Sequence, residues 1–118
     1  MNLRREQIEV FRELMSKRFE DRMVAHLERH FPEQCRALGE AGTREAIQYG
    51  IEQAASYRIV AERDVCKYID VMFAYGRDFD TDPKLPWAGA ILRDETLGGP
   101  RDRVDRLCSV AIEHLDAR

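Results

Sequence analysis

The chain has 118 residues, of which 44% are hydrophobic and 35% are charged, and this balance is typical of one folded globular domain, residues 1–118. Its 19 basic and 22 acidic residues are interspersed and give a net charge of -3, so we expect no basic face for nucleic acid. The longest apolar runs are a few residues, which argues against membrane insertion.

Three widely spaced cysteines, Cys35, Cys66 and Cys108, each have apolar neighbours in the sequence. An odd number at such spacing is typical of reduced, buried thiols rather than of a disulfide framework. The N-terminus carries two arginines, but acidic residues interrupt the apolar stretch that a secretory signal needs. The sequence therefore predicts a cytoplasmic protein.

The first predicted element is a long helix, or two joined helices, from residue 3 to about residue 31. Its apolar side chains recur at helical spacing and form one stripe. That stripe consists of Ile8, Phe11, Met15, Phe19, Met23, Leu27 and Phe31. Pro32 is expected to end this helix, because proline disfavours helical backbone in the residue before it. A short helical turn over 33–38 and a loop at Gly39 and Gly42 are expected next.

Thr43 is a suitable N-cap for a helix over 44–57, whose small residues would let another helix approach closely. After a brief connection at 58–60, the stretch 61–76 is the most apolar in the chain. Only a narrow polar strip interrupts its hydrophobic surface, so we expect it at the centre of the fold. Gly76 is a natural C-cap for this helix.

Residues 76–88, GRDFDTDPKLPWA, are expected to form an exposed corner, and a short helical turn over 86–92 follows. Gly98 and Gly99 break the chain again, and Pro100 suits the first turn of a final helix. That helix has a predicted inward stripe of Val104, Leu107, Cys108, Ala111 and Leu115. The predicted fold is all-α, a compact bundle of four to five helices with an extended Asp/Pro-rich corner between the central and C-terminal helices.

The corner carries Asp78, Asp80 and Asp82 at every second position, as the first three ligands of an EF-hand do. The sixth position, which needs a glycine, is Pro83, and the twelfth, which needs a glutamate, is Gly89. We therefore reject a calcium loop. A catalytic acid pair is also disfavoured, because exposed carboxylates keep ordinary pKa values.

A structural role explains the corner better: one aspartate caps a turn, and another pairs with Arg63 or Arg77. Trp87 then packs on the bundle or anchors a protein partner. The corner and the polar strip of the central helix together form our candidate partner-binding surface. Its residues are Arg63, Lys67, Arg77, Asp78, Phe79, Asp80, Asp82, Leu85 and Trp87.

His26 and His30 are one helical turn apart, a spacing that can place two imidazoles on one metal ion. The zincin order H-E-x-x-H is absent, and although Cys35 could be a third ligand, no fourth is evident. The serines do not occur in a nucleophile motif. We therefore predict no metal, no cofactor and no catalytic residues.

Residues 57–92, YRIVAERDVCKYIDVMFAYGRDFDTDPKLPWAGAIL, resemble small helical bacterial proteins of type VI secretion effector clusters. The shared pattern is Y-x-I, then ERDV-x-x-YID-x-MF and GRDFD-x-DP-x-LPWA, and HFPEQC at 30–35 is also similar. The match covers about a third of the chain. The resemblance implies an accessory or co-chaperone role beside an effector, its adaptor chaperone and a spike protein.

The expected function is therefore that of a non-enzymatic accessory protein, which binds an adaptor chaperone, a toxic effector or both and supports stability or loading for export. Three alternatives remain. One is an immunity protein, whose acidic corner would suit a toxin with a basic cleft. Another is a small metal-dependent enzyme that uses His26, His30 and an aspartate. The third is a structural homodimer formed through the long first helix.

Overall fold

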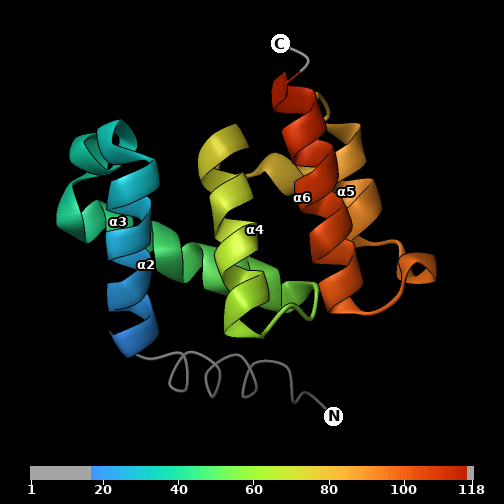
Figure 1. The fold of residues 1–118 in the computed structure, drawn as a ribbon, viewed down its shortest axis with the longest axis horizontal. Coiled ribbons are helices and arrows are strands. Elements are labelled where there is room, and N and C mark those ends of the chain that lie inside the picture. The colour runs from blue at the N-terminus through green and yellow to red at the C-terminus, as the bar shows by residue number, and fades with distance from the viewer. Residues whose placement is uncertain (1–16, 117–118) are drawn as a thin grey trace.

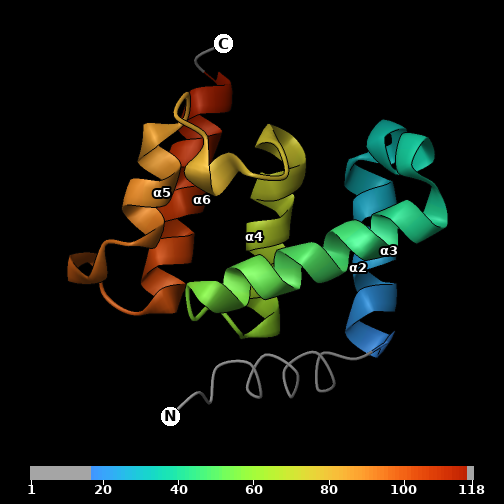
Figure 2. The same ribbon diagram turned by 180° about the vertical axis from the view of Figure 1, so that it is seen from behind.

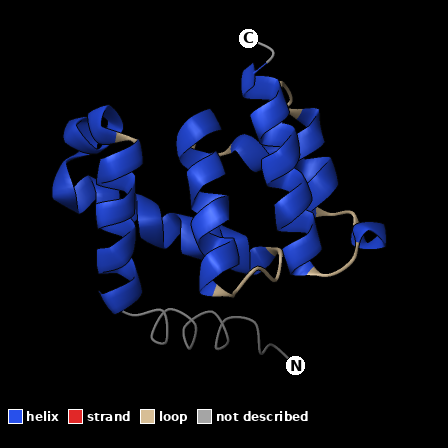
Figure 3. Cartoon of the chain, viewed as in Figure 1, coloured by secondary structure: helices blue, strands red, loops and turns tan. Residues whose placement is uncertain are grey.

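The computed structural model of the protein describes residues 17–116, and these fold into helices joined by turns (Figure 3). The start of the predicted first helix, with Ile8, Phe11 and Met15, lies outside the described residues, as does about half of the homodimer interface predicted there. Within 17–116 there are five α-helices, two short 3-10 helices and no strand. They are α2 (Lys17–His30), α3 (Pro32–Ser56), α4 (Glu62–Tyr75), η1 (Phe79–Thr81), α5 (Pro86–Leu92), η2 (Glu95–Leu97) and α6 (Pro100–Asp116). The predicted all-α fold is confirmed.

Helices α2, α4 and α6 stand side by side, and α3 crosses behind α2 and α4 (Figures 1 and 2). The short helix α5 lies along α6 and also contacts η1. Helix α4 contacts α2, α3, α6 and η1. The expectation that the most apolar helix occupies the centre is therefore confirmed.

Each of the five helices contributes at least one fully buried side chain to a single core. Leu27, Ile47, Tyr68, Leu92 and Leu107, one from each helix in chain order, are all 0% exposed. Full burial of a side chain of this size stabilises the fold by about 1.5–3 kcal/mol. The core therefore connects the two ends of the bundle without interruption.

The loop predicted around Gly39 and Gly42 is absent, and that prediction is wrong. Helix α3 leaves helical geometry only at Gly39, where φ is 74° and ψ is 173°. Glycine adopts a positive φ without steric cost, so one residue changes the direction of the chain and no loop is needed. Thr43 is consequently buried inside α3 and is not the predicted N-cap.

The small residues of α3 allow the close helix approach that the sequence predicted. A Cβ atom added at Gly50 would lie only 2.7 Å from Cγ1 of Ile69 on α4. Contacts that short do not occur between carbon atoms that are not bonded, so this crossing requires glycine. It places α4 directly against the C-terminal half of α3.

Candidate functional site

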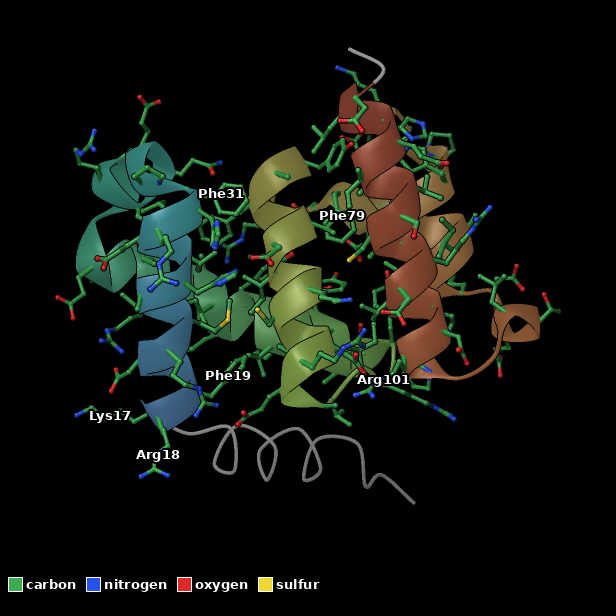
Figure 4. The ribbon with its side chains drawn as sticks, viewed as in Figure 1. Lys17, Arg18, Phe19, Phe31, Phe79 and Arg101 are labelled. Atoms are coloured by element: carbon green, nitrogen blue, oxygen red, sulfur yellow. The ribbon has the colours of Figure 1, made fainter. Side chains whose placement is uncertain are left out.

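The corner after α4 is turned into the protein over part of its length, which corrects the prediction of an exposed corner. Phe79 is 1% exposed, and its ring centroid lies 5.1 Å from that of Tyr68 (Figure 4). Asp80 is 6% exposed and accepts a 2.6 Å hydrogen bond from the hydroxyl of Tyr57. Burial, together with this bond to Asp80, raises the pKa of Tyr57 to about 12. Neither Phe79 nor Asp80 is available to a partner, because the short helix η1 packs both against the core.

Removing the hydroxyl groups of Tyr57 and Tyr68, the two tyrosines beside η1, should change the free energy of unfolding in opposite directions. The Tyr68 hydroxyl is buried and has no hydrogen-bond partner within the described residues, whereas the Tyr57 hydroxyl donates a hydrogen bond to Asp80. We expect Tyr68→Phe to raise the free energy of unfolding by about 1 kcal/mol and Tyr57→Phe to lower it by about 1.5 kcal/mol. Urea denaturation of both variants measures this difference. A loss of stability in Tyr68→Phe would show that its hydroxyl is satisfied.

The three aspartates of the corner have separate partners and do not share one site. Asp78 accepts a hydrogen bond from the hydroxyl of Tyr49. Asp82 accepts one of 2.9 Å from the backbone N–H of Lys84 and thereby closes a turn. With Asp80 bonded to Tyr57, each carboxylate holds a different element in place. One of them does cap a turn, as predicted.

Arg77 forms its ion pair with α3 and not with a corner aspartate. Its two terminal nitrogens donate to the carboxylate of Glu45 at 2.9 and 2.6 Å. This paired guanidinium holds the pKa of Glu45 below its ordinary value. The guanidinium carbon also lies 3.8 Å from the centre of the Tyr49 ring, a cation–π contact. Arg77 therefore fastens the end of α4 to α3.

Arg63 and Lys67 lie toward the other end of α4 and do not form one surface with the corner. Both donate to Oδ1 of Asp105 on α6, at 2.9 and 3.2 Å. These two cations, Arg63 first, hold the pKa of Asp105 below its ordinary value. A helix rises 1.5 Å per residue, so Arg63 lies about 18 Å from Tyr75, the last residue of α4, and Arg77 follows two residues later. The predicted partner-binding residues therefore divide between the two ends of α4.

Trp87 is held in a fixed position by two aromatic neighbours. Its ring meets Tyr75 edge-on at a centroid distance of 5.3 Å and stacks on His114 at 4.7 Å. The hydroxyl of Tyr75 in turn donates to the carbonyl of Ala111 at 2.6 Å and ties α4 to α6. Trp87 remains only partly buried, and Leu85, the N-cap of α5, is partly buried against the core.

The last turns of α6, beside Trp87, expose two large aliphatic side chains. Ile112 is 58% exposed and Leu115 is 42% exposed, and their spacing of three residues places them on one face. The prediction that Leu115 belongs to the inward stripe is wrong, because α6 extends beyond its neighbours at this end (Figure 1). Trp87 and His114, together with Ile112 and Leu115 on a different side of the same helix end, are hereafter called the α6-end surface. The sequence signal for this exposed pair was that apolar residues three positions apart continue after Ala111, the last buried residue of α6.

A second group of polar side chains lies between α2 and α4. Nε2 of His26 lies 2.8 Å from Oδ1 of Asp70, and Sγ of Cys66 completes a set of three ligand atoms within 4.8 Å of one another. The His30 ring stands beside His26 at a centroid distance of 4.6 Å. Cys35, the third metal ligand that the sequence suggested, is buried in α3 and is not part of the group.

Burial dominates the acid–base properties of this group. It raises the pKa of the Cys66 thiol to about 11. It also raises the pKa of Asp70, although the hydrogen bond with His26 acts to lower that pKa. An open cleft of about 320 Å³ adjoins the group. Its lining residues are Phe19, Arg22, Met23, His26, Glu62, Arg63 and Cys66.

Fold and geometry define an all-α helical-bundle protein. No protein-family model, curated protein or solved structure matches the chain. Within residues 17–116, the helices are too short or too polar to cross a membrane.

Proposed function

We propose that the protein is a non-enzymatic accessory protein, or co-chaperone, of a type VI secretion system. It binds an adaptor chaperone, a toxic effector or both in the bacterial cytoplasm, and supports their stability or loading for export. The observation that carries this proposal is the α6-end surface, where a tryptophan is held in position against His114 and the last turns of α6 also expose two aliphatic side chains.

The α6-end surface has the physical properties of a protein-binding hot spot. Tryptophan is among the residues that contribute most to binding free energy when a partner covers them. Tyr75 and His114 hold the Trp87 ring from two sides, so little side-chain entropy is lost when a partner docks. Ile112 and Leu115 add apolar area that water leaves on contact.

The resemblance to secretion accessory proteins supports the same surface. Trp87 belongs to the LPWA end of the motif at 57–92, and the buried parts of that motif position it. Phe79 and Asp80 fix the corner, and Tyr75 contacts the indole ring itself. The motif therefore combines a rigid joint with one aromatic side chain that faces outward in part.

The immunity-protein alternative keeps only part of the acidic corner on which it was based, since Asp78 is exposed and Asp82 is half-buried. An acidic corner would suit a basic toxin cleft, but Asp80 is buried and bonded to Tyr57. Asp78 and Asp82 are also engaged, by a tyrosine hydroxyl and a backbone N–H. The metal-dependent alternative rests on other residues, those around His26.

Trp87→Ala is expected to lower the affinity for the partner at least tenfold, or about 1.4 kcal/mol. The partner is obtained by co-expressing the chain with its neighbouring genes and identifying the protein that co-purifies. Affinity is then measured by calorimetry, after circular dichroism has shown that the variant keeps its helices. Ile112→Ser, at an exposed position, repeats the test without touching the core and should also weaken binding.

The matched control is Leu97→Ala, which removes an exposed aliphatic side chain, 38% exposed, on η2 beyond the other end of α5. Its affinity should equal that of the wild type. Undiminished binding by both Trp87→Ala and Ile112→Ser would remove the α6-end surface from consideration. Protection of cells from the effector, without any effect on its secretion, would instead indicate an immunity protein.

A further inference from the structure

The group between α2 and α4 is built from two helical pairs that face each other. His26 and His30 are four residues apart on α2, and Cys66 and Asp70 are four residues apart on α4. At that spacing two side chains lie on the same face of a helix, one turn apart. The 2.8 Å contact between His26 and Asp70 shows that the two faces meet.

We propose that His26, Cys66 and Asp70 bind one Zn²⁺ ion, with a fourth coordination position open to the adjoining cleft. The imidazole nitrogen, the thiolate sulfur and the carboxylate oxygen are the three ligand types that zinc accepts in proteins. Calcium and magnesium are disfavoured, because they require oxygen ligands and only Asp70 supplies one. This proposal uses residues remote from Trp87 and is independent of the proposed function.

The ligand atoms need only small side-chain movements to reach zinc geometry. Zinc bonds of about 2.0–2.3 Å separate ligand atoms by roughly 3.3–3.6 Å around a tetrahedral ion. His26 and Asp70 therefore separate by about half an ångström, and Cys66 moves closer from within its 4.8 Å limit. The hydrogen bond between histidine and aspartate is replaced by two metal bonds.

The surroundings of the group suit an entering cation. His26 and Cys66 both line the open cleft, so the ion can reach them from solvent. Two arginines also line this cleft, but Arg22 is paired with Glu62, and Arg63 with Asp105. Their charges are therefore compensated by nearby carboxylates. Cys66 is not in a disulfide, and its thiol releases a proton to solvent when the sulfur binds the ion.

The expected result is one Zn²⁺ bound per chain. The full-length protein is purified with a chelator, and zinc is added in a calorimeter, with cobalt(II) as a second, spectroscopic probe. A thiolate-to-cobalt absorption band reports directly on Cys66. A hundredfold excess of zinc over its Kd should also raise the Tm by roughly 10 °C, because the ion binds the folded protein, in which α2 and α4 face each other.

Matched variants separate this site from ordinary surface chelation by two histidines. Cys66→Ala and His26→Ala should each lower zinc affinity at least about tenfold, and Cys66→Ala should abolish the cobalt band. The controls are Cys108→Ala, a part-buried thiol outside the group, and His30→Ala, one turn from His26. Both controls should bind as the wild type does.

Two results would overturn the proposal. One is the absence of zinc binding at micromolar concentrations in the folded wild-type protein. The other is equal loss of affinity in His26→Ala and His30→Ala with no effect of Cys66→Ala, which would mean that α2 alone chelates the ion through its two histidines. Circular dichroism of each variant confirms that the helices persist during these measurements.

Discussion

Replacing Arg103 with methionine is expected to lower the free energy of unfolding by about 3 kcal/mol. Arg103 lies on α6 and is 7% exposed, which is unusual for an arginine. Its guanidinium donates to the backbone carbonyl of Leu92, and at 3.0 Å to that of Tyr57. One side chain therefore connects α6 to two other parts of the chain.

Both acceptors lie at the C-terminal ends of helices, which explains why a buried cation is tolerated there. Leu92 is the last residue of α5, and Tyr57 is the C-cap of α3. The last carbonyls of a helix lack partners within the helix and carry its negative dipole end. Methionine fills a similar volume but donates no hydrogen bond. Both carbonyls would therefore lose the hydrogen bond that Arg103 donates to them. Each such loss costs about 1–3 kcal/mol.

Urea denaturation of Arg103→Met, followed by circular dichroism, measures the change in the free energy of unfolding. Arg106→Met is the matched control, because Arg106 lies about one turn further along α6 and is exposed. The control should change the free energy of unfolding by less than about 0.5 kcal/mol. A loss below about 1 kcal/mol in Arg103→Met would mean that water replaces the guanidinium at both carbonyls.

The helices could be predicted from the sequence because local signals determine where they begin and end. Helix α4 runs over Glu62–Tyr75, close to the predicted 61–76, and α6 begins at Pro100 as predicted. Apolar spacing, Gly76 and Pro100 carry that information within a few residues of each boundary. The sequence predicts a break near Gly39, which the structure has. The predicted loop is too long, because a single glycine with a positive φ makes the break.

The side-chain pairs could not be predicted, because they join residues far apart in the chain. The stretch PRDRVDRL has three arginines, and its local sequence does not show that Arg103 is the buried one. Arg103 is buried because it donates hydrogen bonds to carbonyls at the ends of α3 and α5. Asp80 appeared exposed for the same reason, since its partner Tyr57 comes from the end of α3. Polar residues at helix ends and corners depend on tertiary packing.

One of the three proposed zinc ligands, His26, could be predicted from the sequence through its spacing of four from His30. Cys66 and Asp70 in CKYID have the same spacing of four, but the sequence does not show that they face His26. Pairing two such motifs requires knowing that α2 and α4 face each other. The sequence instead suggested Cys35, which is closer in the chain but faces the core.

Gly89→Ala is expected to lower the free energy of unfolding by about 2 kcal/mol. A Cβ atom at this position would lie 2.6 Å from the backbone carbonyl oxygen of Asp80 and 2.9 Å from the guanidinium nitrogens of Arg93. The arginine can move aside, but the carbonyl cannot, because Asp80 is buried and bonded to Tyr57. Alanine favours helix by up to about 1 kcal/mol, which offsets only part of the clash.

Gly99→Ala is the matched control, since an added Cβ at Gly99 meets nothing within 4 Å. Thermal and urea denaturation of the two variants should differ by about 2 kcal/mol. A Gly89→Ala variant as stable as Gly99→Ala would show that α5 shifts away from η1 at little cost. Trp87 lies two residues before Gly89 on α5, so a methyl group at position 89 that pushes α5 away from η1 also moves the indole ring from His114. Gly89→Ala should therefore weaken partner binding in the same assay as Trp87→Ala, whereas Gly99→Ala should leave it unchanged.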